Sequence, residues 1–219
     1  DSEEKIGRIM KKRRKECILA TKTNRRDAQG ALRDLKMSLR RLQTDFIDLY
    51  QLHTVSEPEL YPQVMAAGGA LEGVKKAQEK GLIGHVGITI HRCWEVMEKA
   101  IKSGEFSTIM VAYSPLDQEG VEKKILPMAK DNDMGVIVMK PLSGGALSTP
   151  GLEGRPDPLI ADALWYIIAN QAVTTVIPGM RNAREVEENA KVGKRERGMN
   201  QEEIKDLRHR IGNLGKSFR

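Results

Sequence analysis

Two titratable side chains each stand at the end of an apolar run of the sequence. Lys22 closes the run Cys17 to Thr21, and His53 closes the run Phe46 to Leu52. An ammonium group and an imidazole suit acid–base chemistry and the stabilisation of negative charge on a reacting oxygen. In a parallel barrel the carboxyl ends of the strands form one active-site face, so distant residues meet there. We therefore expect Lys22 and His53 to be able to meet in space. Their positions alone leave open a catalytic pair and a structural alternative, in which the lysine is buried with a partner and the histidine is a satisfied core residue.

Two loops in the second half of the chain have the composition of a phosphate site. They run from Met139 to Gly145 and from Ile177 to Asn182. Glycines allow close approach of the backbone, and a helix amino terminus carries partial positive charge. Asn182 with Glu185 forms a variant of the capping box, which predicts a helix from Ala183. Two arginines flank that helix start, so the spacing alone leaves open a phosphate site and an ordinary turn with solvated arginines.

Short apolar runs alternate with amphipathic stretches along the chain, a pattern that predicts alternating strands and helices. The predicted strands span residues 17–22, 46–52, 85–89, 108–113, 135–139 and 174–177. The predicted helices span residues 2–14, 27–42, 69–80, 94–101, 121–130, 159–170, 183–190 and 201–214. A serine at position 2 is the expected cap of the first helix.

Such an alternation fits an open doubly wound sheet or a (β/α)8 barrel. A dinucleotide-binding sheet of the first kind needs a glycine fingerprint after its first strand, and Thr23 to Asp27 contains no glycine. We therefore predict an α/β fold of the TIM (β/α)8 barrel type, with about six of its eight strands present in this chain.

Composition sets further bounds on the class of protein. The chain has 219 residues, of which 40% are hydrophobic, and a formal net charge of +6. This size suits one domain, and the absence of a long apolar or signal-like segment predicts a soluble, cytoplasmic protein without a membrane partner. Basic residues are interleaved with acids and lack neighbouring aromatics, so nucleic acid is an unlikely partner. Cys17 and Cys93 lack metal-ligand spacing, and both are expected to be reduced and structural.

Several motifs together resemble the aldo-keto reductase family. They are Ile18–Thr23 (ILATKT), Ser38–His53 (SLRRLQTDFIDLYQLH), Gly87–Thr89, Tyr113–Asp117, Lys140–Leu142, and Val176–Gly179 followed by Glu188–Asn189. The resemblance covers essentially the whole chain. It implies one barrel domain over residues 1–219, with barrel units over 1–190 and a basic linker and helix over 191–219. It also implies an oxidoreductase that binds a nicotinamide cofactor and reduces a small aldehyde or ketone.

The family uses an Asp, Tyr, Lys and His tetrad, and the resemblance assigns the catalytic lysine and histidine to Lys22 and His53. No residue matches the family's aspartate and tyrosine, so we expect these, with two further strands, to lie upstream of Asp1. The 219 residues alone are not expected to complete the tetrad. The alternative is a catalytically silent cofactor-binding or protein-interaction module of the same fold, with Lys191 to Arg197 used for docking. Some relatives continue into an iron–sulfur segment, but the sequence ends before any such cysteines and no metal is predicted.

The resemblance also implies a cofactor site. Thr89 takes the place of a serine that contacts the nicotinamide amide, while Ile90 and Met110 depart from the family's usual asparagine and glutamine. Met139 stands where an aromatic ring commonly stacks on the nicotinamide. The expected pyrophosphate residues are Lys140, Leu142, Ser143 and Gly144, and the expected adenosine residues are Arg181, Glu185, Glu188 and Asn189. Arg181 suits a 2′-phosphate, which favours NADP(H) over NAD(H), whereas Glu185 argues mildly for NAD(H). The oligomeric state is left open.

Overall fold

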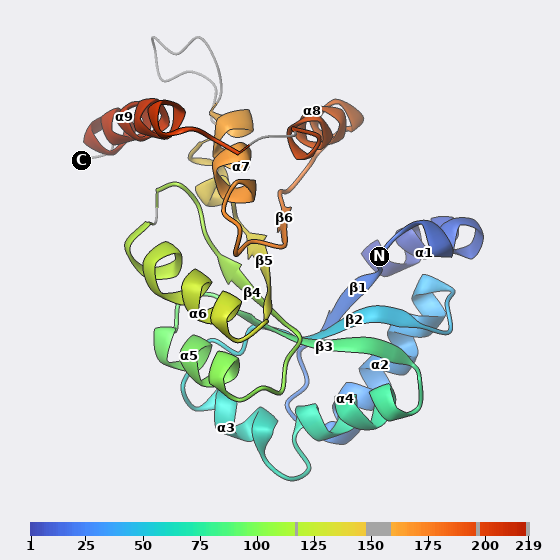
Figure 1. The fold of residues 1–219 in the computed structure, drawn as a ribbon. Coiled ribbons are helices and arrows are strands. Elements are labelled where there is room, and N and C mark those ends of the chain that lie inside the picture. The colour runs from blue at the N-terminus through green and yellow to red at the C-terminus, as the bar shows by residue number, and fades with distance from the viewer. Residues whose placement is uncertain (117, 148–158, 196–197, 218–219) are drawn as a thin grey trace. The chain divides into compact units, whose positions relative to one another are not determined.

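The computed structural model describes residues 1–116, 118–147, 159–195 and 198–217 (Figure 1). These residues form two compact units. Unit 1 comprises Asp1–Met110 with Asn132–Met134, and unit 2 comprises Val111–Asp131 and the chain from Gly135 onward. The predicted single barrel domain is not tested by this division and stays a prediction. Asp117 and Arg197, which belong to predicted motifs, lie outside the described residues.

Strands and helices alternate along the chain, as the apolar pattern predicts. The first half contains α1 (Ser2–Arg13), η1 (Arg14–Glu16), β1 (Ala20–Thr23), α2 (Ala28–Leu42), β2 (Ile47–Leu52), α3 (Leu60–Met65), α4 (Ala70–Glu79), β3 (Ile83–Ile90), α5 (Trp94–Lys102) and β4 (Thr108–Ala112). The second half contains η2 (Gln118–Ile125), α6 (Leu126–Asp131), β5 (Gly135–Met139), η3 (Ser143–Gly145), α7 (Ile160–Ile168), β6 (Thr175–Ile177), α8 (Ala183–Gly193) and α9 (Gln201–Ser217). The sheet has the strand order β1-β2-β3-β4-β5-β6.

The parallel register of β1, β2 and β3 in unit 1 aligns the predicted catalytic positions. Lys22 pairs with Gln51, and Gln51 pairs with Gly87. The amide of His53 extends the ladder by donating to the carbonyl of Thr23 at 2.9 Å. Because paired residues share a face and side chains alternate along a strand, Lys22, His53 and Thr89 are placed on the same face.

The opposite face of these strands is covered by α2 and α4 (Figure 1). Tyr50, which alternates with Gln51, is buried with its hydroxyl 3.5 Å from the carbonyl oxygen of Ala31 in α2. Helix α2 begins where the side chain of Asp27 accepts a hydrogen bond from the amide of Gly30 at 2.7 Å, a standard N-cap. Burial of one apolar face therefore explains both the helix and its place on the sheet.

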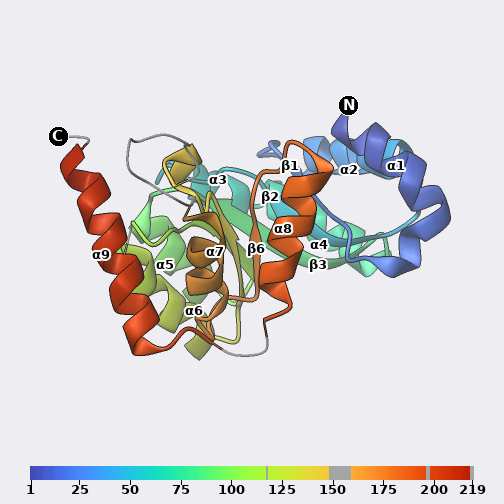
Figure 2. The ribbon, with the colours of Figure 1, turned by 90° about the horizontal axis from the view of Figure 1, so that it is seen from above.

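Two glycines let helices of unit 1 approach α2 closely. A Cβ on Gly73 of α4 would lie 2.4 Å from the carbonyl oxygen of Ala28. A Cβ on Gly7 of α1 would lie 2.1 Å from the carbonyl oxygen of Arg41, near the end of α2. Figure 2 shows α1 beside α2 in a second view. Both helix contacts thus depend on a missing side chain.

In unit 2, β5 and β6 pair in parallel, with Met139 opposite Ile177. Helix α6 packs on β5, and α7 contacts β6, α8 and α9. A small core forms where Leu164 and Trp165 of α7 meet Val192 of α8.

A polar cluster centred on Glu122 joins several elements of unit 2. The hydroxyl of Tyr113 donates to the carboxylate of Glu122 at 2.5 Å, and the hydroxyl of Tyr166 donates to the same oxygen at 2.7 Å. Arg208 of α9 donates to the Tyr166 hydroxyl at 3.1 Å and lies 3.6 Å from Glu122. Burial raises the pKa of Tyr113, which keeps this phenol protonated as a donor. The cluster therefore connects α7 and α9 to η2.

The structure corrects the predicted elements at several points. Strand β1 begins at Ala20 rather than at position 17: residues 17–19, which follow the 3-10 helix η1, are not part of the strand, and Ile18 is exposed. The predicted helix over 121–130 is a π-helix (η2) followed by the short helix α6. Asp1, not Ser2, is the N-cap residue of α1. Helix α3 has no counterpart in the prediction, since six residues with one buried side chain give too weak a periodic signal.

The close contact at Gly73 leads to a stability prediction. Gly73→Ala is expected to lower the free energy of unfolding by about 1–3 kcal/mol, because the new methyl group overlaps backbone that cannot move away easily. Urea unfolding followed by circular dichroism measures the change. Gly193→Ala is the matched control, because a Cβ added at that helical position would have no atom within 4 Å. An equal loss of stability in the two variants contradicts the role given to Gly73.

Candidate active site

Lys22 and His53 lie at adjacent strand ends of unit 1, as predicted. Lys22 is the third residue of the four-residue strand β1, and its side chain is exposed. His53 directly follows β2 and is half-buried. The charge of Lys22 is close enough to affect the ionisation of His53. The structure therefore places the two side chains at neighbouring strand ends, and their shared catalytic role stays a prediction.

The imidazole of His53 sits in an environment that favours its neutral form. Partial burial is the largest effect that lowers its pKa below the ordinary value of 6.5, followed by electrostatic interactions with Lys22, His91 and Arg26. A neutral imidazole has one N–H donor and one acceptor nitrogen. The neutral ring of His53 can therefore donate one N–H hydrogen bond to a carbonyl oxygen.

Thr89 lies near the end of β3 and is 1% exposed. Its hydroxyl accepts a hydrogen bond from the amide of Thr54 at 2.7 Å, so the side chain holds the loop that follows His53. The hydroxyl keeps its own proton for another acceptor. Contact between Thr89 and a nicotinamide amide stays a prediction.

The backbone between His53 and Val55 has an unusual conformation. Thr54 has a φ of 53°, in the left-handed region. This conformation costs a non-glycine residue about 1–2 kcal/mol, and it is rarer still for a β-branched side chain. Such strain persists only where neighbouring contacts hold it, and it is commonest at functional sites.

The predicted pyrophosphate loop in unit 2 follows β5 directly. Lys140 has a φ of 54° and Ser143 a φ of 51°, and Gly144 is also left-handed with a φ of 68°. Gly145 follows with a φ of 108°, and the amides of Ser143 and Gly145 donate to the carbonyl oxygens of Lys140 and Leu142 within the loop. The hydroxyl of Ser143 lies 2.5 Å from that of Ser114. Contact between this loop and a pyrophosphate stays a prediction.

The predicted adenosine residues lie at the start of α8. Asn182 caps the helix by accepting from the amide of Glu185 at 3.0 Å, which confirms the predicted helix start. The carboxylate of Glu185 accepts from the amide of Arg181 at 2.7 Å and from its guanidinium at 3.0 Å. These bonds lower the pKa of Glu185. The Arg181 side chain is nevertheless 89% exposed, so its guanidinium is accessible to a ligand.

The remaining predicted positions are on the following turns of α8. The carboxylate of Glu188 accepts from the guanidinium of Arg184 at 2.7 Å. Asn189 lines an apolar groove of unit 2, between α7, β6 and α8, with a volume of about 400 Å³. The predicted cofactor residues of unit 2 thus fall on the loop after β5 and on the first turns of α8.

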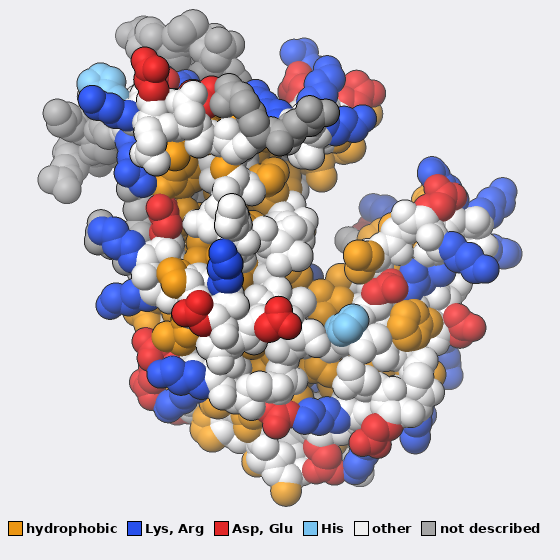
Figure 3. Space-filling view, viewed as in Figure 1, with side chains coloured by type: hydrophobic (Ala, Val, Ile, Leu, Met, Phe, Trp, Pro, Cys, Tyr) orange, Lys and Arg blue, Asp and Glu red, His pale blue; other side chains and the backbone are white. Residues whose placement is uncertain are grey.

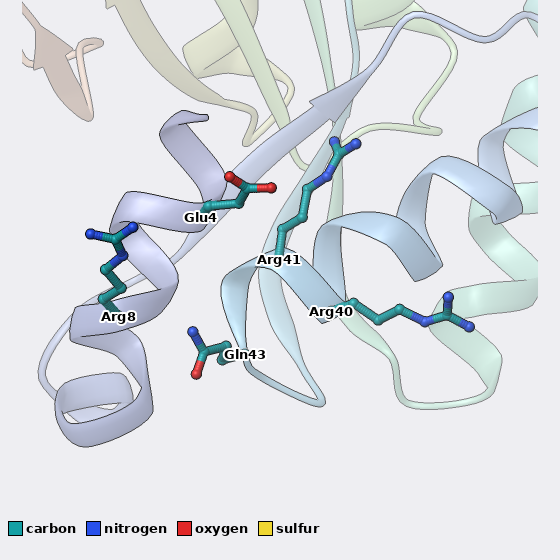
Figure 4. Close-up of a pocket in the computed structure, with 5 residues that line it drawn as sticks. All are labelled: Glu4, Arg8, Arg40, Arg41 and Gln43. Atoms are coloured by element: carbon teal, nitrogen blue, oxygen red, sulfur yellow. The ribbon is translucent and has the colours of Figure 1, made fainter.

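A second hollow, of about 420 Å³, lies between α1 and the end of α2 in unit 1. Figure 4 shows the residues that line it: Glu4, Arg8, Arg40, Arg41 and Gln43. The side chains of Arg8 and Arg40 extend away from each other (Figure 4), so the arginines do not converge on one ligand position. Neither Lys22 nor His53 lines this hollow.

The basic residues of the surface are interleaved with acidic ones. Blue and red side chains alternate over the helices in Figure 3, with Lys and Arg most frequent over α1. Pairs such as Lys5 with Asp1, at 2.7 Å, and Lys99 with Glu95, at 2.6 Å, are one helical turn apart. The arrangement agrees with the expectation of solvated helix faces.

Three absences concern only the described residues. Within those ranges no group of three His, Cys, Asp or Glu side chains is placed to hold a metal ion. Among the helices described, none combines the length and the apolar composition that a membrane span needs. Cys17 and Cys93 are both free, and Cys17 is exposed rather than part of the core.

Sequence reasoning missed Arg26, His91 and Thr54 as neighbours of His53. Arg26 follows β1 in a polar loop and has the sequence signature of a solvated arginine. Its guanidinium instead donates to the carbonyl oxygens of His53 and Thr54. No local pattern predicts this contact, because it joins residues 27 and 28 positions apart.

Comparisons with known proteins agree with the fold. The model of the Aldo/keto reductase family matches residues 1–159. The uncharacterized oxidoreductase YqkF of Bacillus subtilis is 26% identical, over 94% of this chain and 78% of that protein. The holo form of an aldo-keto reductase from Bacillus halodurans superposes with a TM-score of 0.77 at 28% identity, covering 94% of this chain and 76% of that chain.

An aldo/keto reductase from Klebsiella pneumoniae, solved in complex with NADP and acetate, has the same fold. Its TM-score is 0.75 at 23% identity, covering 94% of this chain and 74% of that chain. The predicted α/β class and the barrel relationship are thereby confirmed. The chain belongs to the aldo/keto reductase family, a family of oxidoreductases.

The cationic surroundings of His53 lead to a prediction about its ionisation. Lys22→Met is expected to raise the pKa of His53, because one of the positive charges that oppose its protonation is removed. NMR titration of the imidazole measures the shift. Lys36→Met is the control, since this exposed lysine of α2 is not among the causes of the lowered pKa. An unchanged His53 pKa in Lys22→Met contradicts the proximity of the two groups.

The same ionisation predicts how stability depends on pH. The pKa of His53 is lower in the folded protein than in the unfolded chain, so folding disfavours the protonated form. This contribution to stability is fully present above the unfolded pKa, near 6.5, and is lost as the pH falls through the folded pKa. Urea unfolding at a series of pH values is expected to show that loss in the wild type and less of it in His53→Gln. Equal pH profiles for the two proteins contradict the prediction.

Proposed function

We propose that this protein transfers a hydride between NADP(H) and a small aldehyde or ketone, with Lys22 and His53 at the reacting carbonyl. The observation that carries the proposal is the placement of these two side chains at adjacent strand ends. Burial, which lowers the pKa of His53, supports a neutral imidazole there. Membership of the aldo/keto reductase family supports the class of reaction.

His53 orients the substrate in this proposal. Its neutral imidazole donates an N–H hydrogen bond to the carbonyl oxygen, and that bond strengthens as negative charge develops there. The ammonium of Lys22 adds a positive charge on the same face of the sheet, which stabilises that charge further. It would also lower the pKa of a phenol beside it and so favour proton transfer from that phenol. The family's aspartate and tyrosine have no match in residues 1–219, so no side chain of this chain is proposed as the proton donor.

The donor groups of unit 2 fit a dinucleotide phosphate. When bound, the nicotinamide cofactor supplies the hydride. Lys140, Ser143 and Gly144 offer an ammonium group, a hydroxyl and left-handed backbone on one loop. Arg181 offers an exposed guanidinium at a helix amino terminus, where a phosphate is favoured. We propose these residues, with Leu142, Met139, Glu185, Glu188 and Asn189, as the cofactor site.

NADP(H) is proposed over NAD(H) because Arg181 places an exposed cation directly before the cap of α8. A guanidinium binds a phosphate through two parallel charge-assisted hydrogen bonds, whereas its hydrogen bond to a neutral ribose hydroxyl is weaker. Glu185 is neutralised in part by Arg181 itself, so its carboxylate need not repel the 2′-phosphate.

Fluorescence titration with NADPH and NADH tests the cofactor proposal. The wild type is expected to bind NADPH more tightly than NADH. Arg181→Met is expected to weaken NADPH binding about tenfold, the loss of one charge-assisted pair, while NADH binding changes little. Lys191→Met, which removes a positive charge from the last turn of the same helix, is the control.

A set of small aldehydes and ketones tests the reaction. In protein that binds NADPH, the expected result is oxidation of the nicotinamide only when a carbonyl compound is present, and loss of that reaction in His53→Leu. Tight NADPH binding without turnover of any carbonyl compound indicates that this chain binds the cofactor but does not complete the reaction. Absence of binding to both nucleotides contradicts the proposed function.

A further inference from the structure

The loop after His53 is held by one arginine side chain. In Arg26, Nη1 donates to the carbonyl oxygen of His53 at 2.9 Å and Nη2 donates to the carbonyl oxygen of Thr54 at 3.1 Å. The two terminal nitrogens of the guanidinium therefore bind two successive carbonyls. This fork is specific to arginine, since the ammonium of a lysine is a point charge without fixed donor directions.

Arg26 is itself fixed by its neighbours. Its carbonyl oxygen accepts a hydrogen bond from the amide of Ala70 at 2.9 Å, and Asp27 bridges to Gly69 in antiparallel fashion. Its side chain is half-buried, and burial lowers the pKa of its guanidinium, an effect that the Glu57 carboxylate partly offsets. Burying a cation costs free energy unless hydrogen bonds compensate, so the two bonds to backbone carbonyls indicate a stable structural contact.

Thr89 holds the same loop from the other side. Its hydroxyl accepts from the amide of Thr54 at 2.7 Å, and its carbonyl oxygen accepts from the amide of Val55 at 3.0 Å. Thr54 is therefore bound at both its amide and its carbonyl, and it is the residue with the left-handed φ. The strained conformation is maintained by these bonds, since an unrestrained threonine would leave it.

The backbone of His53 is bound in the same way. Its amide donates to Thr23 of β1 at 2.9 Å, and its carbonyl accepts from Arg26. With both backbone groups fixed, the direction of the Cα–Cβ bond is fixed as well. Small displacements of a reacting group reduce catalysis strongly, so this bond direction has a catalytic consequence.

We propose that Arg26 is a positioning residue, which clamps the carbonyls of His53 and Thr54 and so directs the His53 imidazole toward the substrate. Its catalytic consequence rests on the function proposed above. The clamp itself is a property of unit 1 and can be measured without any substrate.

The fork and the positive charge of Arg26 predict different outcomes for substitution. If Arg26 acted on His53 only through its charge, Arg26→Lys would behave like the wild type. If it acts through the fork, Arg26→Lys and Arg26→Met both release one carbonyl or both. Arg25→Met is the matched control, because Arg25 is the adjacent arginine but donates to Asp34 at 3.3 Å and not to the loop.

NMR of the substrate-free protein tests the clamp. The amide of Thr54 is expected to exchange slowly with solvent in the wild type and in Arg25→Met, and at least tenfold faster in Arg26→Lys. The imidazole signals of His53 are expected to move and broaden in the same variant. Circular dichroism verifies that each variant is folded. Should Arg26→Lys fail to fold, Arg26→Gln keeps one donor without the charge and is expected to show intermediate exchange.

Kinetics with the carbonyl substrate tests the consequence. Arg26→Lys is expected to lower kcat roughly tenfold to a hundredfold. NADPH affinity is expected to stay unchanged, and added guanidinium ion is expected to restore part of kcat in Arg26→Ala. Thr54 exchange and kcat in Arg26→Lys that match the wild type would overturn the proposal. A wild type without turnover refutes the proposed function alone, because the exchange measurement still decides whether the clamp exists.

Discussion

The parallel pairing of β2 with β1 and β3 is the constraint on which the rest of unit 1 depends. It fixes Lys22, Gln51 and Gly87 in one row across the strands, and it places His53 and Thr89 further along β2 and β3 on the same face. A slip of one residue in β2 would turn His53 toward α2 and bring Tyr50 to the face of Lys22. The site is therefore a property of the register, and the helices on the other face preserve it by burying the alternate residues.

An arginine side chain forms hydrogen bonds near each end of strand β2. Near its start, Arg14 donates to the carbonyl of Phe46 at 3.0 Å and to the carboxylate of Asp48 at 2.6 Å. That carboxylate also accepts from the amide of Leu19 at 2.7 Å, which joins the approach to β1 to β2. At the other end, Arg26 binds the carbonyls that follow the strand. Both arginines come from segments next to β1. Their side chains therefore connect β1 to β2 outside the residues that pair through backbone hydrogen bonds.

Much of this arrangement could be predicted from the sequence, because it depends on local pattern. Strand β5 and the start of α8 were predictable from an apolar run and an asparagine cap, and Lys22 and His53 from their places at strand ends. The beginning of β1 could not be predicted, because an apolar run is taken to indicate burial and Ile18 is apolar but exposed. Arg26 and Thr54 could not be identified because their roles come from hydrogen bonds across unit 1. The amino-acid composition around Thr54 does not indicate that this threonine has a positive φ.

The π-helix η2 has a consequence for how this protein can change in evolution. It contains Glu122, whose carboxylate accepts hydrogen bonds from the hydroxyls of both Tyr113 and Tyr166. An α-helix of the same sequence advances about 100° per residue, so loss of one residue from η2 would rotate everything beyond the deletion by about that angle. Glu122 would then be unchanged as a residue but would lose its hydrogen bonds to Tyr113 and Tyr166. The contacts of Glu122 therefore depend on the length of this segment as well as on the identity of the residue.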